Sequence, residues 1–146
     1  MENGEMRAMT RPSRSLDPIP NPYPQRDYEI FVEAPEFTTL CPKTGQPDFG
    51  VITFRYRPGP YIIELKSLKL YLWSFRDEGH FHEAVTNQIA DDFIRFAQPR
   101  YLEVIGKFNV RGGIGTTVRV EYTADAELAS CGGPMGTGIT RSAGSK

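Results

Sequence analysis

The chain has 146 residues, of which 24% are charged and 39% are hydrophobic, and its formal net charge is −1. This length suits one domain of ordinary size, and a charge near zero excludes a strong general attraction to nucleic acid or anionic membranes. The two cysteines are too few for the disulfide framework of a small secreted domain. No apolar run resembles a signal peptide or approaches the roughly 20 residues of a membrane span. We therefore expect a cytoplasmic protein with no direct nucleic-acid or membrane partner.

The two ends differ in composition from the middle of the chain. Residues 1–26 contain many prolines, which prevent regular helix, and they predict a flexible arm or an arm lying over a neighbouring molecule. Residues 124–146 are rich in Gly, Ser and Thr and predict a flexible tail. The folded domain then spans residues 27–123. A domain of that size is marginal alone, so we expect a homo-oligomer.

The first regular pattern is an alternation of apolar and polar side chains. It predicts a half-buried strand over residues 51–57. Pro58-Gly59-Pro60 is typical of a turn, and residues 61–64 resume as an extended segment. The two strands are therefore expected to form a hairpin.

Two predicted helices follow. Apolar residues recur at steps of three and four over residues 65–76 and again over residues 82–98. Pro99 ends the second pattern, as proline usually does. Each helix would bury one apolar side.

Two further strands complete the pattern. Alternation returns over residues 101–111 and 114–122, and Gly112-Gly113 between them is a strong hairpin signal. The order ββααββ predicts an α+β domain in which two helices cover one face of an antiparallel sheet. Such a sheet has two open edges, which copies of the chain could close by joining their sheets into a barrel.

Cys41 and Asp48 are candidates for catalysis. Cys41 lies in a polar loop beside Lys43, whose positive charge would favour the thiolate, although a free cysteine is also common as a structural residue. Asp48 follows in the same loop, where aspartate is also a frequent turn residue. If the loop folds Asp48 against the thiol, its carboxyl could take and return protons.

His80, His82 and Glu83 form a second polar group. With Cys41, the two histidines suggest zinc ligands, but the set is thin, because the chain has no third His and Cys131 lies in the predicted flexible tail, and we expect no metal. The other interpretation places His82 and Glu83 at the start of the second helix, where Glu83 would complement the helix dipole.

Lys66 and Lys69 lie at the junction between a strand and the first helix. They are either a solvated charged face or part of an anion site, in which free N–H groups of the helix N-terminus and lysine charges converge on phosphate. Arg111 adds a cation in a glycine hairpin. No GxGxxG motif follows a strand, so a dinucleotide would not be held in the Rossmann manner.

These segments together resemble the QueF family, the NADPH-dependent 7-cyano-7-deazaguanine reductases, in its branch with a single short domain. The similarity spans roughly residues 26–123, and Cys41 precedes Asp48 by seven residues, which is the family's spacing. The matching segments are Phe37–Asp48 (FTTLCPKTGQPD), Glu64–Phe75 (ELKSLKLYLWSF), Phe81–Asn87 (FHEAVTN) and Arg111–Ile114 (RGGI). The N-terminal arm and the tail with Cys131 lie outside it.

The resemblance implies the tunnelling fold (T-fold), with subunits in barrel-shaped rings and two rings stacked into a decamer. It also implies a reaction, the reduction of the nitrile of 7-cyano-7-deazaguanine to 7-aminomethyl-7-deazaguanine on the route to queuosine in tRNA. Two NADPH would be consumed. Cys41 would form a covalent thioimide with the nitrile carbon, and Asp48 would supply protons to the nitrogen.

The resemblance further implies binding roles. Glu83 would accept hydrogen bonds from the deazaguanine, with His82 beside it and with Ser67 and Glu64 as further substrate contacts. The cofactor phosphates would be held by cations, namely Lys66, Lys69 and Arg111.

Two other functions stay open on the residues alone. One is a metal-dependent pterin or GTP hydrolase of the same fold, which the shortage of Cys and His ligands disfavours. The other is a non-enzymatic purine-binding module, in which Glu83 would matter and Cys41 would not.

Overall fold

The structure is a computed structural model that describes residues 10–125. Within that range, no helix has the length and apolar character needed to cross a membrane. The described residues form eight helices and strands. They are β1 (Pro18–Pro20), β2 (Ile30–Leu40), β3 (Pro47–Arg57), β4 (Tyr61–Ile63), α1 (Leu65–Trp73), α2 (His82–Ala97), β5 (Tyr101–Arg111) and β6 (Ile114–Thr123).

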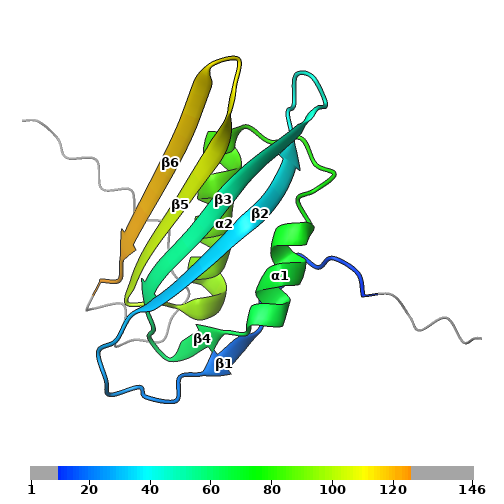
Figure 1. Cartoon of the computed structure of the whole chain (residues 1–146). Helices are drawn as coiled ribbons and strands as arrows, with labels where there is room; N and C mark the ends of the chain where they lie inside the picture. Colours follow the sequence, from blue (N-terminus) through cyan, green and yellow to red (C-terminus); the bar gives the residue numbers. More distant parts are fainter. Residues whose placement is uncertain (1–9, 126–146) are drawn as a thin grey trace, which may run out of the picture.

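The main sheet contains four antiparallel strands in the order β2-β3-β5-β6 (Figure 1). In the register between β2 and β3, Thr39 lies opposite Asp48, and between β3 and β5, Phe54 lies opposite Val104. Alternate side chains of β3 are buried, as the period of two predicted. Because the register between β3 and β5 is continuous from Gly50 to Arg57, the start of β3 is fixed relative to the packing of its middle.

Both helices cover the buried face of this sheet. Phe93 of α2 stacks on Phe54 at a centroid distance of 5.2 Å and meets Tyr56 edge-on at 4.8 Å. Phe75, just after α1, lies 6.0 Å from Phe37 of β2. These aromatic contacts hold the ends of both helices on the core. The predicted α+β domain, an antiparallel sheet with two helices, is confirmed.

The predicted hairpin between residues 51–57 and 61–64 is wrong. β4 pairs with β1 in a separate two-stranded sheet, and the main-sheet partner of β3 on that side is β2. The long strand β2 was not predicted, because its alternation is interrupted by a bulge between Ala34 and Phe37. An eleven-residue partner offers β3 far more hydrogen bonds than a three-residue strand does.

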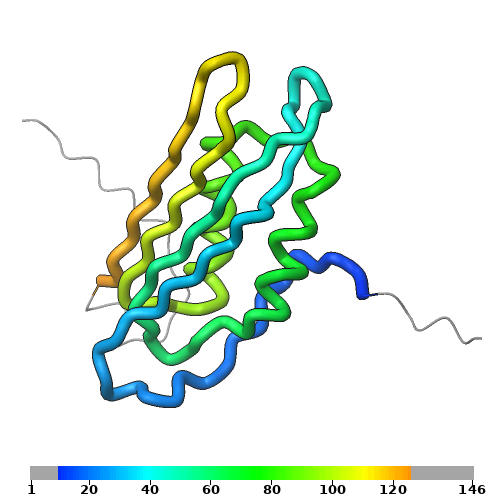
Figure 2. Tube along the Cα trace, in the orientation of Figure 1, coloured from blue at the N-terminus to red at the C-terminus, as the bar shows by residue number. Residues whose placement is uncertain are grey.

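The N-terminal segment packs against its own domain from residue 10 onward. Leu16 is only 1% exposed, and the N–H of Ser13 donates to the carbonyl of Leu70 on α1 at 3.2 Å. Figure 2 shows this segment passing beside α1 before it forms β1. It differs from the flexible or neighbour-bound arm that the prolines suggested. Residues 1–9, and the tail beyond residue 125 with Cys131, lie outside the described residues.

Candidate active site

A tight turn presents Cys41 at the end of β2. The N–H of Cys41 donates to the carbonyl of Gln46 at 2.8 Å, and the N–H of Gly45 donates to the carbonyl of Cys41 at 2.8 Å. Gly45 has a φ of +71°, which glycine adopts without strain. The Cys41 thiol is free and partly buried. A thiol in this position can meet a small molecule without unfolding the turn.

Hydrogen bonds within the turn lower the pKa of the Cys41 thiol below its ordinary value. The largest contribution is the side chain of Thr44, followed by the backbone N–H groups of Thr44 and Lys43. Partial burial and the charge of Asp48 act in the opposite direction. Lys43, expected to act through its ammonium, thus contributes through its backbone. Thiolate is the nucleophilic form, so the turn favours reactivity.

Asp48 is the buried charged group of the site. Its side chain is 11% exposed, and its two oxygens have different partners. Oδ2 lies 3.4 Å from Nε2 of His82, and Oδ1 lies 3.1 Å from Nη1 of Arg111. A buried carboxylate needs such partners, because unpaired burial of charge is costly. Thr39 and Leu40 pair with Asp48 and Pro47 across β2 and β3, so Cys41, the next residue along the chain, lies at the same end of the sheet as Asp48.

The first turn of α2 supplies two of the predicted residues. The ring of His82 stacks on Phe108 of β5, with centroids 3.8 Å apart and planes at 2°. The hydroxyl of Thr86 donates to the carbonyl of His82 at 2.7 Å. Glu83 follows and is exposed, and no described residue forms a hydrogen bond or ion pair with its carboxylate. Glu83 can therefore complement the helix dipole and still accept bonds from a ligand.

Arg111 forms an ion pair with Asp48 within this chain. Besides the ion pair, its guanidinium donates to the side chain of Gln46 at 3.4 Å and to the carbonyl of Pro47. These contacts therefore join the end of β5 to the start of β3. The sequence suggested a phosphate contact for Arg111 and gave no sign of this pairing, since the partners are distant along the chain.

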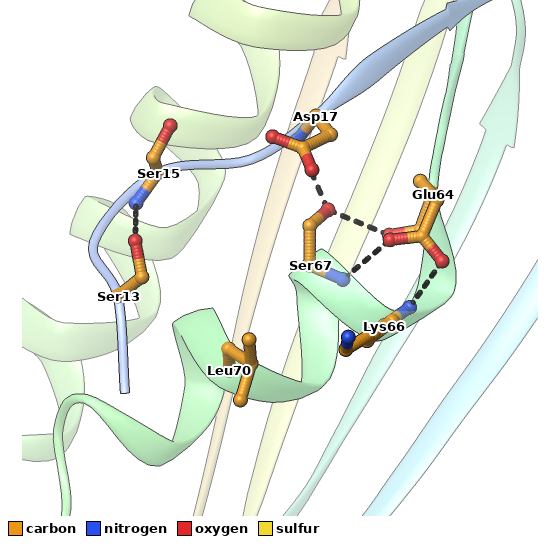
Figure 3. A pocket seen from close by; sticks show the side chains of 7 residues that line it. All are labelled: Ser13, Ser15, Asp17, Glu64, Lys66, Ser67 and Leu70. Carbon is orange, nitrogen blue, oxygen red and sulfur yellow. Dashed lines mark hydrogen bonds between the residues drawn. The ribbon is translucent and has the colours of Figure 1, made fainter. Parts of the chain in front are cut away.

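The N-terminus of α1 does not offer the free N–H groups that an anion site needs. The carboxylate of Glu64 accepts from the N–H groups of Lys66 and Ser67, both at 2.7 Å. The hydroxyl of Ser67 donates to the carbonyl of Glu64 and accepts from the N–H of Asp17. Figure 3 shows this cluster at the start of the helix. The predicted anion site at the free N–H groups of this helix is therefore wrong.

The structure thus brings together only part of the predicted set. Cys41, Asp48, His82 and Arg111 meet at one end of the sheet. The other group of predicted residues lies at the start of α1, beside β1 and β4, which Figure 1 shows at the opposite end. That group consists of Glu64, Lys66, Ser67 and Lys69. Among residues 10–125, no group of three or more His, Cys, Asp or Glu side chains is arranged to hold a metal.

The fold and site define a class of protein, an α+β protein in which a free cysteine and a paired carboxylate lie at the same end of an antiparallel sheet. The family described as QueF-like protein matches residues 47–127. The chain is 58% identical to a protein of Thermomicrobium roseum over 118 residues, which are 81% of this chain and 92% of that protein. It is 58% identical to one of Thiobacillus denitrificans over 114 residues, 78% of this chain and 82% of the relative. Both relatives are named NADPH-dependent 7-cyano-7-deazaguanine reductase.

The chain belongs to the QueF family. A solved structure adds a likeness of fold, namely the crystal structure of the archaeosine synthase QueF-Like in the apo form. The two align with a TM-score of 0.61 at 18% identity, over 66% of this chain and 95% of that one. At this identity the likeness supports the fold alone.

Removing the Thr44 hydroxyl should raise the pKa of Cys41, since that group makes the largest contribution to lowering it. In Thr44→Ala, we expect the pH–rate profile for alkylation of Cys41 by iodoacetamide to move to higher pH, because less thiolate forms at a given pH. Thr44→Ser keeps a hydroxyl and serves as the control. The rate is followed by mass spectrometry of the Cys41 peptide, and an unmoved profile in Thr44→Ala would exclude this cause.

Proposed function

We propose that this chain reduces the nitrile of 7-cyano-7-deazaguanine to 7-aminomethyl-7-deazaguanine with NADPH, through a covalent bond to Cys41, in queuosine biosynthesis. The observation that carries the proposal is the coincidence of two facts. The chain is 58% identical over 92% of a reductase of this name, and its Cys41 lies in one site with the paired carboxylate of Asp48. A binding module would need neither group.

Proton transfer between Cys41 and Asp48 accounts for the first step. The carboxylate of Asp48 takes the proton of the thiol, and the thiolate forms a bond to the nitrile carbon. One electron pair of the C≡N bond moves to nitrogen, which receives the proton back from Asp48. The product is a thioimide whose C=N group accepts hydride more readily than the nitrile. His82 and Arg111 keep the carboxylate in place during both transfers.

NADPH, when bound, would supply two hydrides. The first, with one proton on nitrogen, would reduce the C=N group of the thioimide, after which the C–S bond breaks, the Cys41 thiol is regenerated and an imine remains. The second, with another proton, would turn the imine into the amine. Lys66 and Lys69 fit its phosphates, because both are exposed and neither is ion-paired with a described residue. With the N–H groups of Lys66 and Ser67 already bonded to Glu64, this binding would rest on the lysine ammonium groups. Arg111 would have to leave Asp48 to join them.

Glu83 is our candidate for recognition of the deazaguanine. A carboxylate that accepts two N–H bonds from the base edge selects a guanine-like ring. The other candidates, Glu64 and Ser67, are already bonded within the helix cap, so they have less capacity for a ligand of the same chain. His82 stands next to Glu83 and would lie against the bound base.

Assembly of several copies would bring the two groups of residues together. Among residues 10–125, β6 has no strand on its outer side, and β2 has there only an isolated bridge between Leu40 and Gly79. Long unpaired edges favour association. We propose two stacked rings of such copies, in which a site can draw residues from more than one chain.

If the edges are joined in this way, the purified chain has a mass of several subunits. Light scattering at micromolar concentration should give a multiple of 16.4 kDa. A mass of one subunit, with full reductase activity, would contradict a site shared between copies.

A covalent adduct is the most direct sign of the proposed chemistry. Mixing the chain with 7-cyano-7-deazaguanine alone should add the mass of one nitrile molecule to the peptide of Cys41. Addition of NADPH should remove the adduct while the amine appears. Cys41→Ser should bind the nitrile without a mass increase. Binding to the wild-type chain with no adduct, and with Cys41 open to alkylation, would favour the purine-binding module instead.

Asp48→Asn separates proton transfer from binding, since the amide keeps the shape of the side chain and cannot relay a proton. We expect kcat to fall by roughly 100- to 10,000-fold, the usual contribution of a general acid–base group, with binding of the nitrile retained. Steady-state kinetics and calorimetric titration measure the two effects. Turnover at the wild-type rate would remove Asp48 from the mechanism.

A further inference from the structure

The side chain of Arg14 reaches from the N-terminal segment to the connection between the two helices, residues 74–81, which we term the interhelix segment. Its Nε donates to the hydroxyl of Ser74 at 2.8 Å and its Nη2 to the carbonyl of Ser74 at 3.3 Å. Nη2 also lies 2.7 Å from Oε2 of Glu78. The guanidinium stacks over the ring of Phe75 at 3.7 Å. Four contacts of one side chain therefore fix the course of this segment.

The interhelix segment in turn holds the end of β2. The N–H of Leu40 donates to the carbonyl of Glu78 at 3.0 Å, and the N–H of His80 donates to the carbonyl of Leu40 at 3.0 Å. The hydroxyl of Thr39 donates to the same Glu78 carbonyl at 2.8 Å. Leu40 immediately precedes Cys41. The backbone of Glu78 thus sets where the turn that carries the thiol begins.

The same segment leads into the other half of the site. It ends at residue 81, and His82, the partner of Asp48, begins α2. The carboxylate of Glu78 is divided between Arg14 at Oε2 and His80 at Oε1, 2.9 Å away. The hydrogen bond from Arg14, and then that from His80, holds the pKa of Glu78 below its ordinary value. The carboxylate of Glu78 therefore stays charged in mildly acidic solution, and its ion pair with Arg14 persists there.

We infer that Arg14 is a positioning residue of the reductase site, which acts on Cys41 and His82 through the interhelix segment. This inference rests on the proposed function and extends it to the N-terminal segment, which the sequence left without a role. Arg14 touches neither reacting group. Its effect is to limit the movement of Glu78 and thereby the separation of the thiol from the carboxylate that relays its proton.

The chemistry of arginine suits this position. Its planar guanidinium donates to Ser74 and Glu78 in fixed directions and stacks on Phe75 at the same time. A lysine can keep the ion pair but not the stacked, forked geometry. Exposed ion pairs contribute little stability by themselves, so an effect on the site need not accompany a large loss of stability.

The test uses the full chain and a property of Cys41 that does not require the reductase reaction. The variants are Arg14→Ala, Glu78→Gln and the double variant, with Arg11→Ala as the matched control. Arg11 is exposed and has no ion pair with a described residue. The readouts are the iodoacetamide alkylation rate of Cys41 against pH, resolved by peptide mass spectrometry, and kcat and KM for nitrile reduction.

We expect Arg14→Ala and Glu78→Gln each to change the Cys41 alkylation rate by about three- to tenfold, and the double variant to match the single ones, as residues of one network do. The kcat value should fall more than KM changes, and Arg14→Lys should restore part of it. Arg11→Ala should match the wild type. Should Arg14→Ala not fold, Glu78→Gln, which removes only one surface charge, carries the test.

The contrary result is a folded Arg14→Ala or Glu78→Gln variant with the wild-type alkylation profile and kcat. It would show that the contacts of Arg14 support the structure and do not position the site. Failure of the proposed function would look different. A wild-type chain without nitrile reduction, but with the coupled change in alkylation, would overturn the reductase proposal and leave the link between Arg14 and Cys41 standing.

Discussion

The buried carboxylate of Asp48 is the point where three parts of the fold meet. It stands at the start of β3, and its oxygens face His82 at the start of α2 and Arg111 at the end of β5. A buried charge is tolerated only when it is paired and hydrogen-bonded. The carboxylate is therefore satisfied only when sheet, helix and hairpin are assembled together. The proton relay that we propose therefore depends on the completed tertiary structure as well as on the loop that carries Cys41.

Two opposed influences act on Cys41 in consequence. The charge of Asp48 disfavours the thiolate, whereas donors within the turn, above all Thr44, favour it, and the net pKa is lowered. A carboxylate close enough to take the proton always exerts such repulsion. The turn donors offset it only while they keep their direction toward sulfur. The hydrogen bonds between Leu40 and the interhelix segment therefore matter for the pKa of Cys41 as well as for packing, because they fix the start of the turn.

Local patterns predicted much of the fold. Both helices and three of the four main strands follow from the period of their apolar residues, and the hairpin at Gly112-Gly113 follows from glycines with positive φ. The failures concern pairing between distant segments. The pattern predicts that residues 61–64 pair with the nearest strand, yet residues 61–63 pair with β1, which lies in the proline-rich segment where an arm is expected. Proline content alone does not distinguish a free arm from a short edge strand.

The same contrast between local patterns and distant contacts applies to the residues of the site. Cys41 and Asp48 lie seven residues apart, and His82 adjoins Glu83, so spacing relates the members of each pair. Thr44, three residues after Cys41, carried a local signal as a hydroxyl in the same turn. The glycine hairpin marked Arg111 as a candidate cation but not its pairing with Asp48, and Arg14 carried no signal, because a long side chain finds its partner through tertiary structure. Both arginines join elements that are remote in sequence, and each fixes a group on which the thiol depends. The residues that we propose to react are thus close neighbours in sequence, whereas the two arginines that hold their surroundings come from distant segments.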